Sequence, residues 1–453
     1  MQRALILGAA KSGKSACKML GKKGYMVYLT DDNQKKLNRV YRDRFMKSLS
    51  LIVLSPGIPI SHPIVEIAKQ YGIDLLCEFE LGVLEMKCPS IMITGTNGKT
   101  TTTLLTHKLL QGFKNGEVFL GGNVGIPVTS FASETKAGDI AVLEASSFQL
   151  EYKKRAAAHV AVLLNLAPDH LSRHGSMENY IQSKLKIFDG QTSDDFAVLN
   201  YDDKLAVEKA LPVIDANVYY FSTKSVVKGC FALDGSIYFN DGNTSVKIAD
   251  VSDVKIMGEH NLQNALAAIL SSLLVGGEPG KIRKNLSEFS GVSHRLEWVM
   301  DVENVGFFND SKATNIASTI VAMNAMTADT TIILGGSDKG LDFDELFLNV
   351  PEKIVNFICI GETKQKLLAS AKKCGCKNVY EADTLREAVD LGFSLSKNGD
   401  AVLLSPACAS YDMFSSYEER GKVFINIVRE KLKDEEKHKL KHKFRRKKQK
   451  DIS

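Results

Sequence analysis

The sequence predicts an α/β protein with more than one sheet. The first observation is a series of short, continuous apolar runs, the pattern of parallel strands that are buried on both faces. The second is that three of these runs lead directly into glycine-containing turns, within 4–8, 91–95 and 331–336. The third is the length of 453 residues, which at roughly 150 residues per domain corresponds to about three domains.

Apolar runs of strand type recur along the chain and alternate with segments of helical periodicity. A helix is expected to begin near Thr101 and to continue through Leu110. Between 215 and 256 the pattern changes to short strands separated by turns such as Asp241-Gly242-Asn243, which predicts a small β insertion. The expected strands lie at 4–7, 51–54, 91–93, 141–143, 160–164, 331–334, 357–360 and 401–404.

These patterns divide the chain into four segments. Residues 1–88 are expected to form a Rossmann-like N-terminal domain, and 89–290 a central P-loop-type mononucleotide-binding domain that carries the β insertion. Residues 291–432 are expected to form a second Rossmann-like domain, and 433–453 a disordered basic tail.

The net charge of the chain has two separate sources. In total, 58 Lys and Arg against 53 Asp and Glu give a formal net charge of +5. Nine of the basic residues and no acidic residue lie within 437–450. The remaining 49 basic and 53 acidic residues give −4, so the folded body is mildly acidic and the basic character belongs to the tail.

Composition and cysteine usage restrict the class of protein. With 44% hydrophobic and 25% charged residues, the chain does not resemble disordered, collagen-like or disulfide-scaffold proteins. No apolar run approaches the ~18 residues that a membrane-spanning helix needs, so we expect no transmembrane segment. The eight cysteines include no C-x-x-C pair, and Cys374-x-Cys376 lacks partners at zinc-site spacing. We therefore expect reduced thiols and a cytoplasmic protein.

A glycine-rich loop between a strand and a helix is the strongest chemical signal. Residues 94–101 have the sequence TGTNGKTT, and such loops bind phosphate through backbone N–H groups and the N-terminus of the following helix. Lys99 would reach the β- and γ-phosphates of a nucleotide, and the Thr100 hydroxyl would ligate Mg²⁺. The spacing is a shortened form of the P-loop, because its first glycine is Gly95. The alternative is a plain helix-capping turn with an incidental lysine.

Polar side chains follow the next strands of the same segment. Glu144 ends one strand, where α/β sheets place ligand-binding groups, and a carboxylate there suits Mg²⁺. His170 follows the next strand, and Tyr180 and Lys184 lie four residues apart on one helical face. Each residue alone has a structural interpretation, as a cap or as a packed side chain. Together they indicate one phosphate and metal site.

The glycine loop at 8–13, GAAKSG, resembles the G-x-G-x-x-G of dinucleotide-binding folds, with Ala10 in place of the second glycine. Asp31 and Asp32 follow at about the distance of a ribose-binding acid. The methyl group of Ala10 crowds the approach of a pyrophosphate, which disfavours NAD and a dehydrogenase function. A further loop at 54–59 follows another strand, and its alternative interpretation is a plain Pro-Gly turn.

The motifs of the chain resemble those of the Mur ligases over about residues 3–430. General marks of the family are GTNGKTT at 95–101, GEHNLQNALAA at 258–268 and HRLE at 294–297. Segments that resemble its D-glutamate-adding branch are LEASSFQLE at 143–151, NDSKATN at 309–315, GGSDKGLDF at 335–343 and SPACASYDMFSSYEERG at 405–421. The resemblance implies three domains that bind a UDP-linked substrate, ATP and an amino acid, in that order along the chain.

The resemblance also implies a reaction. An ATP-dependent ligase would add D-glutamate to UDP-N-acetylmuramoyl-L-alanine through an acyl phosphate and would release ADP and phosphate. This reaction belongs to cytoplasmic peptidoglycan synthesis, and so to cell-wall formation, cell shape, cell division and the cell cycle. The implied cofactors are ATP, two Mg²⁺ ions and CO₂, the last as a carbamate on Lys184. We expect a monomer with small-molecule substrates and no nucleic-acid partner, and the sequence leaves the stereochemistry of the glutamate open.

Roles for individual residues are implied in the same way. The implied catalytic residues are Lys99, Glu144, His170 and Lys184. The implied Mg²⁺ ligands are Thr100, Glu144, His170 and Lys184. ATP contacts are implied for Gly95, Thr96, Asn97, Gly98, Lys99, Thr100, Thr101, Asn261, Asn264, Arg295, Asp310 and Lys312. Contacts with the UDP-linked substrate are implied for Ser12, Asp31, Asp32, Ser55, Gly57 and Asn123, with the choice between Asp31 and Asp32 open. Glutamate contacts are implied for Thr314, Lys339, Ser410, Tyr411 and Tyr417, the last standing where phenylalanine is common.

Alternatives from other classes stand beside this hypothesis. A ligase for another amino acid, or one that extends folate with glutamate, is disfavoured by the segments 338–340 and 405–410. A P-loop switch or motor would use ATP to change shape and would need no amino-acid pocket. For the tail at 437–450, the alternative to a solvated extension is weak attachment to anionic lipid or nucleic acid.

Overall fold

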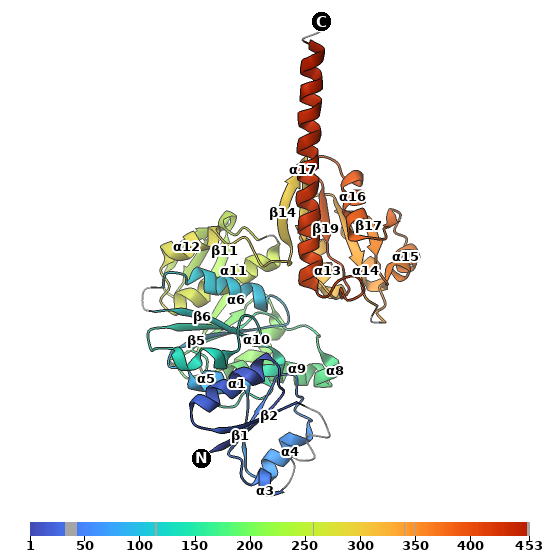
Figure 1. The fold of residues 1–453 in the computed structure, drawn as a ribbon. Coiled ribbons are helices and arrows are strands. Elements are labelled where there is room, and N and C mark those ends of the chain that lie inside the picture. Colours follow the sequence, from blue (N-terminus) through green and yellow to red (C-terminus); the bar gives the residue numbers. More distant parts are fainter. Residues whose placement is uncertain (32–42, 114–115, 257, 339, 349, 451–453) are drawn as a thin grey trace. The chain divides into compact units, whose positions relative to one another are not determined.

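The computed structural model describes residues 1–31, 43–113, 116–256, 258–338, 340–348 and 350–450. It forms two compact units, Met1–Lys255 with His260–Phe289 and Ile256–Glu259 with Ser290–Ser453. Both units combine helices with mainly parallel sheets (Figure 1), so the predicted α/β class is confirmed. Each strand predicted from an apolar run is present. Within the described ranges, no helix is long and apolar enough to cross a membrane.

The first unit begins with a four-stranded parallel sheet in the order β2-β1-β3-β4. Its strands are β1 (Arg3–Leu7), β2 (Met26–Thr30), β3 (Leu51–Leu54) and β4 (Asp74–Cys77). Its helices are α1 (Lys11–Lys22), α3 (Asp43–Met46), α4 (Pro63–Gln70) and α5 (Glu78–Glu85). Helix α4 begins with a proline, a residue that suits the first helical position, and His62 caps it by accepting the N–H of Ile64.

A nine-stranded sheet follows in the order β13-β12-β11-β10-β9-β8-β5-β7-β6. Its strands are β5 (Ser90–Thr94), β6 (Val118–Gly122), β7 (Ile140–Glu144), β8 (Val160–Leu163), β9 (Phe196–Asn200), β10 (Asn217–Ser222), β11 (Gly229–Leu233), β12 (Ser236–Asn240) and β13 (Ser245–Asp250). The predicted β insertion corresponds to β10–β13. It extends the central sheet, because β10 pairs in parallel with β9, while β11, β12 and β13 pair antiparallel with one another.

Helices of the central part connect these strands. They are α6 (Lys99–Leu109), α7 (Ser147–Leu150), α8 (Leu171–His174), α9 (Met177–Leu185), α10 (Lys204–Ala210), α11 (Glu259–Leu274) and α12 (Pro279–Ser287). Short 3₁₀ helices are η1 (Val128–Ser130), η2 (Ala132–Glu134), η3 (Lys186–Phe188), η4 (Leu211–Val213) and η5 (Val251–Asp253).

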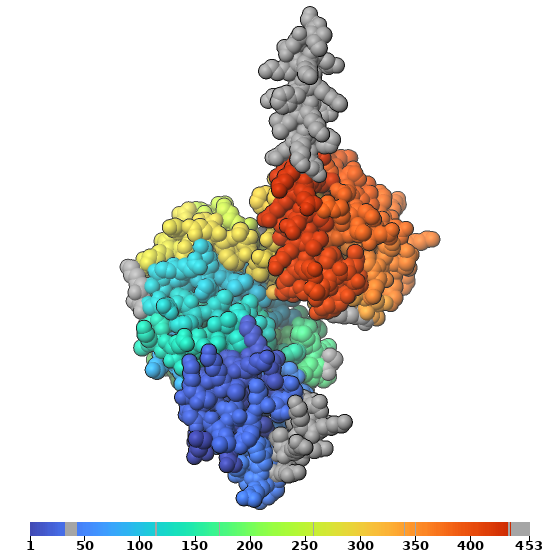
Figure 2. Space-filling view, in the orientation of Figure 1, coloured from blue at the N-terminus to red at the C-terminus, as the bar shows by residue number. Residues whose placement is uncertain are grey.

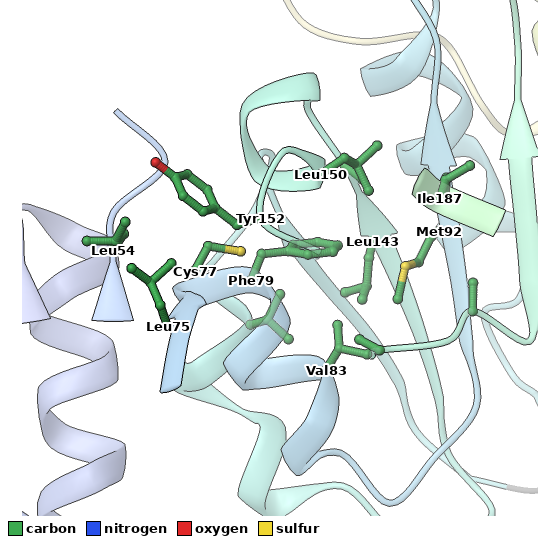
Figure 3. Packing of buried hydrophobic residues seen from close by; sticks show 14 of the residues in the cluster. Leu54, Leu75, Cys77, Phe79, Val83, Met92, Leu143, Leu150, Tyr152 and Ile187 are labelled. Carbon is green, nitrogen blue, oxygen red and sulfur yellow. The ribbon is translucent and has the colours of Figure 1, made fainter. Parts of the chain in front are cut away.

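The first sheet and the central sheet share one hydrophobic core. Figure 3 shows Leu54 and Leu75 of the first sheet, Phe79 of α5, and Met92 and Leu143 of the central sheet in one packed cluster. Phe79 is fully buried, and full burial of such a side chain stabilises a fold by about 1.5–3 kcal/mol. In the space-filling view, the blue residues of the first sheet adjoin the cyan and green residues of the central part (Figure 2). The two sheets therefore form one body.

The second unit has a six-stranded sheet in the order β14-β15-β19-β16-β17-β18. Strands β14 and β15 pair antiparallel, and the other neighbours pair in parallel. The strands are β14 (Glu297–Val302), β15 (Val305–Asn309), β16 (Thr330–Gly335), β17 (Ile354–Ile360), β18 (Val379–Glu381) and β19 (Ala401–Leu404). The helices are α13 (Ile316–Ala325), α14 (Asp344–Leu348), α15 (Lys364–Lys373), α16 (Leu385–Leu395) and α17 (Tyr417–Lys450).

Helix α17 ends the second unit, and disorder of the basic tail at 433–453 stays a prediction. It continues for 34 residues, through most of the segment 433–453 (Figure 1). Beyond Gly421 the sequence contains no glycine or proline up to Lys450, and it is rich in Lys, Glu, Leu and Arg, which are strong helix formers. Backbone propensity therefore favours a helix in this segment.

Candidate active site

The predicted phosphate loop joins β5 to α6 and is shaped by two glycines. Gly95 and Gly98 have φ angles of 152° and 82°. A Cβ on Gly98 would lie 2.2 Å from Asn264 Oδ1, so only glycine fits there without displacing its neighbour. Gly98 caps α6, which begins at Lys99 and not near Thr101 as predicted. The N–H groups of the first helical turn therefore follow directly after the loop, as a phosphate cradle requires.

Side chains from beyond β8 hold this loop in place. The N–H of Asn97 donates to Asn165 Oδ1 (2.8 Å), and Asn165 Nδ2 donates to the carbonyl oxygen of Asn97 (3.2 Å). Thr96 Oγ1 accepts the N–H of Ala167 (2.9 Å) and lies 3.1 Å from the Tyr180 hydroxyl oxygen. The fold thus brings together loop residues and polar residues that the sequence had suggested separately.

Lys99 and Lys184 converge on the carbonyl oxygen of Gly95. Their Nζ atoms donate to it at 2.8 Å and 2.6 Å, and Lys99 also donates to the carbonyl oxygen of Thr96 at 2.7 Å. Lys184 is 1% exposed, and its Nζ lies 4.7 Å from the centre of the Tyr180 ring. Burial, helped by the positive charge of Lys99, holds the pKa of the Lys184 amine well below its ordinary value. A buried amine with a lowered pKa is available as a neutral nucleophile.

Glu144 ends β7 with a carboxylate that is only half satisfied. Its side chain is buried, and Oε1 accepts a hydrogen bond from Asn123 Nδ2 (2.7 Å). The N–H of Asn123 also donates to the Glu144 carbonyl oxygen (2.9 Å). Glu144 Oε2 is buried and has no hydrogen-bond partner. A buried carboxylate oxygen without a donor is unfavourable unless a cation binds it, so this residue fits a Mg²⁺ ligand.

The remaining predicted metal ligands are His170 and Thr100. The His170 ring packs 5.0 Å from the Phe148 ring, and its Nε2 lies 3.4 Å from Asp169 Oδ2. Thr100 lies in the first turn of α6, next to the buried Thr101. In the part of the chain that the structure describes, no group of three or more His, Cys, Asp or Glu side chains is gathered as a metal site. The predicted set has a different composition, with one carboxylate, one imidazole, one hydroxyl and one amine.

Helix α11 brings two predicted nucleotide residues beside the loop. Thr102 Oγ1 donates to Asn264 Oδ1 (3.2 Å), and Asn264 Nδ2 donates to Asn261 Oδ1 (3.0 Å). Both asparagines are buried. Asn264 thus connects α11 to α6 and also occupies the space beside Gly98.

The first glycine loop closes on the segment after β3. Gly8 has a φ of 103°, and a Cβ on it would lie 2.4 Å from Ser55 Oγ, which donates to the Gly8 carbonyl oxygen (3.1 Å). The N–H of Ala9 donates to Asp31 Oδ1 (2.6 Å), so Asp31 is an acid that contacts this loop. Asp32 lies outside the described residues. The other predicted substrate residues are Ser12 in the first turn of α1, Gly57 after β3 and Asn123 after β6.

In the second unit, Asp310 follows β15 and is buried among polar groups. Its Oδ2 accepts a hydrogen bond from Ser405 Oγ (2.7 Å), and its Oδ1 accepts the N–H of Leu296 (3.1 Å). Burial raises the pKa of Asp310 to about 6, although these hydrogen bonds and the positive charge of Arg295 oppose the shift. A carboxyl with such a pKa is largely charged at neutral pH, and so its burial is costly there.

Two further predicted residues, Lys312 and Tyr417, lie close together. Lys312 Nζ is 5.9 Å from the centre of the Tyr417 ring. Burial and the neighbouring Glu418 raise the pKa of the Tyr417 hydroxyl to about 12, so it is protonated at neutral pH. Among the other predicted glutamate residues, Ser410 is buried and Tyr411 is 73% exposed. Thr314 lies between Lys312 and α13, and Lys339 lies outside the described residues.

Arg420, which is absent from the site residues that the sequence implied, is fully buried on α17. Its Nη2 donates to the carbonyl oxygens of Ser311 (2.9 Å) and Cys408 (3.0 Å), and its Nε donates to Ser311 Oγ (3.0 Å). Burial lowers the pKa of its guanidinium to about 10. Arg420 thereby ties the segment after β15 to the segment after β19. The available signal was its position within the motif at 405–421.

The motifs and the fold agree with known proteins. Residues 93–272 match the Mur ligase middle domain, and residues 294–408 match the Mur ligase, glutamate ligase domain. The chain is 38% identical to the UDP-N-acetylmuramoylalanine–D-glutamate ligase of Thermoanaerobacter pseudethanolicus, over 95% of this chain and 98% of the relative. The ligase of the same name from Geobacillus kaustophilus is also 38% identical, over 94% and 97%.

Solved structures show the same fold at lower identity. The MurF ligase of Thermotoga maritima in complex with ADP has a TM-score of 0.57 and 17% identity, over 87% of this chain and 91% of that chain. The UDP-N-acetylmuramate-alanine ligase MurC of the same organism has a TM-score of 0.55 and 18% identity, over 95% and 99%. With relatives of this identity over nearly its whole length, the chain belongs to the Mur ligase family.

Proposed function

We propose that the protein is an ATP-dependent ligase that joins D-glutamate to UDP-N-acetylmuramoyl-L-alanine, with release of ADP and phosphate, in peptidoglycan synthesis. The observation that carries this proposal is that relatives 38% identical over nearly the whole chain bear the name of that ligase. The D configuration rests on these names, because the two enantiomers of glutamate present the same chemical groups. We expect the enzyme to act in the cytoplasm as a monomer.

We assign the three substrates to the three sheets. Residues 1–88, with β1–β4, would bind the UDP-linked substrate in a Rossmann-like domain through Ser12, Asp31, Ser55 and Gly57. Residues 89–290, with β5–β13, would bind ATP. Residues 291–432, with β14–β19, would bind the amino acid through Thr314, Lys339, Ser410, Tyr411 and Tyr417. This assignment follows the order of the motifs along the chain.

The phosphate loop supports the ATP assignment. Lys99 Nζ already lies inside the loop, where it donates to the carbonyl oxygens of Gly95 and Thr96. Turning towards a γ-phosphoryl group would exchange these bonds for charge-assisted bonds, which are about twice as strong as neutral ones. The N–H groups that follow Gly98 would bind the same oxygens. Both would stabilise the charge on the equatorial oxygens during transfer.

We infer that Thr100, Glu144, His170 and a carbamylated Lys184 hold two Mg²⁺ ions. The unpaired Glu144 Oε2 supports a cation at this end of β7. When bound, Mg²⁺ supplies positive charge that stabilises phosphoryl transfer. The lowered pKa of Lys184 supports carbamylation, because only a neutral amine attacks CO₂. The nitrogen forms a bond to carbon, one C–O π pair moves to oxygen, and a proton passes from nitrogen to water.

The reaction then has two steps. The γ-phosphoryl group passes from ATP to the alanyl carboxylate as one P–O bond breaks and another forms, which gives an acyl phosphate and ADP. The neutral amine of glutamate attacks the acyl carbon, a tetrahedral intermediate forms, and phosphate leaves with the acyl C–O pair while the amine proton passes to water. Asn123 holds Glu144 through Oε1, so Oε2 stays available to a cation.

The decisive test measures ADP formation with UDP-N-acetylmuramoyl-L-alanine and a panel of amino acids. We expect turnover with D-glutamate and little with L-glutamate, L-lysine or glycine. Turnover that needs no amino acid would contradict the ligase and favour an ATP-driven switch. Turnover driven best by another amino acid would retain the ligase chemistry and overturn the assigned substrate.

A further inference from the structure

An arginine that sequence analysis did not single out joins the loop after β3 to the segment after β8. Arg173 lies on α8, three residues beyond His170. Its Nη1 donates to the carbonyl oxygen of Gly57 (3.0 Å), and its Nη2 donates to that of Ile58 (2.9 Å). One guanidinium thus binds two successive carbonyl groups of the turn that carries Gly57.

The guanidinium of Arg173 is itself held by an acid and a ring that belong to the central part. Arg173 Nη2 lies 2.8 Å from Glu151 Oε2, and the side chains of this ion pair are 17% and 6% exposed. The Arg173 Cζ also lies 4.8 Å from the centre of the Phe148 ring, which packs against the His170 ring as well. An ion pair with a carboxylate and a contact with an aromatic ring already restrict the rotamers of this guanidinium. It therefore loses little further conformational entropy when it binds carbonyl groups.

The network continues towards the end of β7. Glu151 Oε1 lies 3.1 Å from His174 Nδ1, and His174 Nε2 lies 3.1 Å from Ser147 Oγ. Ser147 begins α7, three residues after Glu144. The turn after β3 is therefore linked, through Arg173, Glu151 and His174, to the strand end that carries the unpaired carboxylate.

The turn after β3 has few means of fixing its own shape. Its sequence from 55 to 59 is SPGIP, so Pro56 and Pro59 have no N–H and Gly57 has no side chain. Within the turn, the N–H of Ile58 donates to the Ser55 carbonyl oxygen (3.0 Å). The Tyr152 hydroxyl adds a bond to the Ile58 carbonyl oxygen (2.9 Å). The carbonyl oxygen of Gly57 accepts a hydrogen bond from Arg173, which is the charged donor among the groups that contact this turn.

We propose that Arg173 is a positioning residue that holds the turn at 55–58 in the conformation that binds the UDP-linked substrate, with Glu151 as its anchor. This inference rests on the proposed function, because it takes Ser55 and Gly57 to contact that substrate. Loss of the guanidinium frees the turn, so the substrate must order it on binding. Affinity for the UDP-linked substrate falls, whereas affinity for ATP, which binds at a separate loop, does not.

A second arginine offers a matched control. Arg155 also joins the central part to the first sheet, through an ion pair between its Nη2 and Asp74 Oδ2 (2.7 Å). Its side chain is 53% exposed, and Asp74 lies at the start of β4, away from the turn at 55–58. Arg155→Met therefore removes a cross-connection of the same kind without releasing that turn.

The experiment compares Arg173→Met, Arg173→Lys and Arg155→Met in the full-length protein. Calorimetry without ATP gives the Kd for UDP-N-acetylmuramoyl-L-alanine, and steady-state kinetics gives the KM of each substrate. We expect Arg173→Met to raise that Kd and the matching KM at least about tenfold, as for the loss of one or two hydrogen bonds from a charged donor. The KM for ATP stays within about twofold of the wild type, as does every constant of Arg155→Met. Arg173→Lys gives an intermediate Kd, because an ammonium group reaches one carbonyl group at a time.

A double-variant cycle tests the anchor. Glu151→Gln is expected to raise the Kd less than Arg173→Met, and the double variant to equal Arg173→Met alone, since both changes act through one contact. An unchanged Kd in Arg173→Met and Arg173→Lys overturns the proposal, as does an equal rise in the KM of all substrates. If Arg173→Met fails to fold, Arg173→Lys decides. Failure of the proposed function itself is separate, since the wild type would then form no ADP in response to D-glutamate.

Discussion

Lys99 and Lys184 donate hydrogen bonds to the same backbone oxygen, that of Gly95, at 2.8 Å and 2.6 Å. Burial, helped by repulsion from the positive charge of Lys99, makes Lys184 lose its proton more readily. Conversion of Lys184 to a carbamate would replace this repulsion by attraction to Lys99. The phosphate loop and the proposed modification are therefore electrostatically coupled.

Replacement of Lys184 by alanine tests this coupling. Because the carbamate would supply a metal-binding anion, we expect Lys184→Ala to lower kcat at least about 100-fold, the scale of losing one electrostatic stabiliser. Short carboxylic acids such as acetate should restore part of the activity. Lys204→Ala, at the exposed start of α10, is the control and should keep wild-type activity. Full activity in Lys184→Ala would refute the carbamate.

Gly98→Ala separates the shape of the phosphate loop from general backbone strain. A non-glycine residue at positive φ costs about 1–2 kcal/mol, and here the added Cβ also displaces Asn264. Gly24 has nearly the same φ, 83° against 82°, with no atom within 4 Å of an added Cβ. We expect both variants to lower the Tm, but only Gly98→Ala to weaken ATP binding, by at least about tenfold. Equal ATP affinity in the two variants would contradict the loop assignment.

Asp310→Asn should change how stability depends on pH. Burial raises the pKa of Asp310 from 3.8 to about 6, so the folded protein binds more protons than the unfolded chain between these values. Wild-type stability therefore falls as pH rises through this window, by about 3 kcal/mol from this residue. The asparagine variant lacks this loss, so its Tm relative to the wild type should rise from pH 4 to pH 6.5.

The control for this variant is Asp329→Asn, which removes a half-exposed carboxylate from the same unit. Its Tm relative to the wild type should show no comparable rise. A difference between Asp310→Asn and the wild type that stays constant across the window would refute the burial of a charged Asp310.

Deletion of 437–453 tests the basic tail. The nine basic residues in 437–450 lie beyond the family match, which ends at 408, and outside every predicted site. We expect kcat and each KM to stay at wild-type values at low and high salt. A salt-sensitive loss of activity would show that the tail's charge acts on the reaction.

Sequence patterns predicted the parts of the fold that depend on local physics. Strands with continuous apolar runs, such as 51–54 and 401–404, coincide with β3 and β19. The start of α6 was placed two residues late, because the left-handed Gly98 ends the loop earlier than the threonine run suggested. The disorder predicted for the tail rests on its charge and stays a prediction, while α17 continues through most of this segment.

The candidate site was predictable only where a motif marks it. The bonds of Lys184 to Gly95 and of Asn264 to Thr102 span 89 and 162 residues, and only the motifs had indicated that these residues belong to one site. Arg420 and Arg173 lie 109 and 116 residues from Ser311 and Gly57, and no local pattern relates them. Asp31 and Asp32 were equivalent in sequence; Asp31 accepts the N–H of Ala9 and Asp32 lies outside the described residues, so the choice between them stays open.

The packing of Phe79 between two sheets also bears on how such enzymes exchange parts in evolution. The segment 1–88 ends with helix α5. The buried face of this helix packs in one core with Leu54 of the first sheet and Leu143 of the central sheet. A piece cut at residue 88 would expose this face and aggregate or unfold. The substrate specificity that we propose for the first sheet could therefore not be exchanged by transferring that sheet as a unit. A new specificity would have to arise by substitutions in the loops that leave the buried contacts of α5 unchanged.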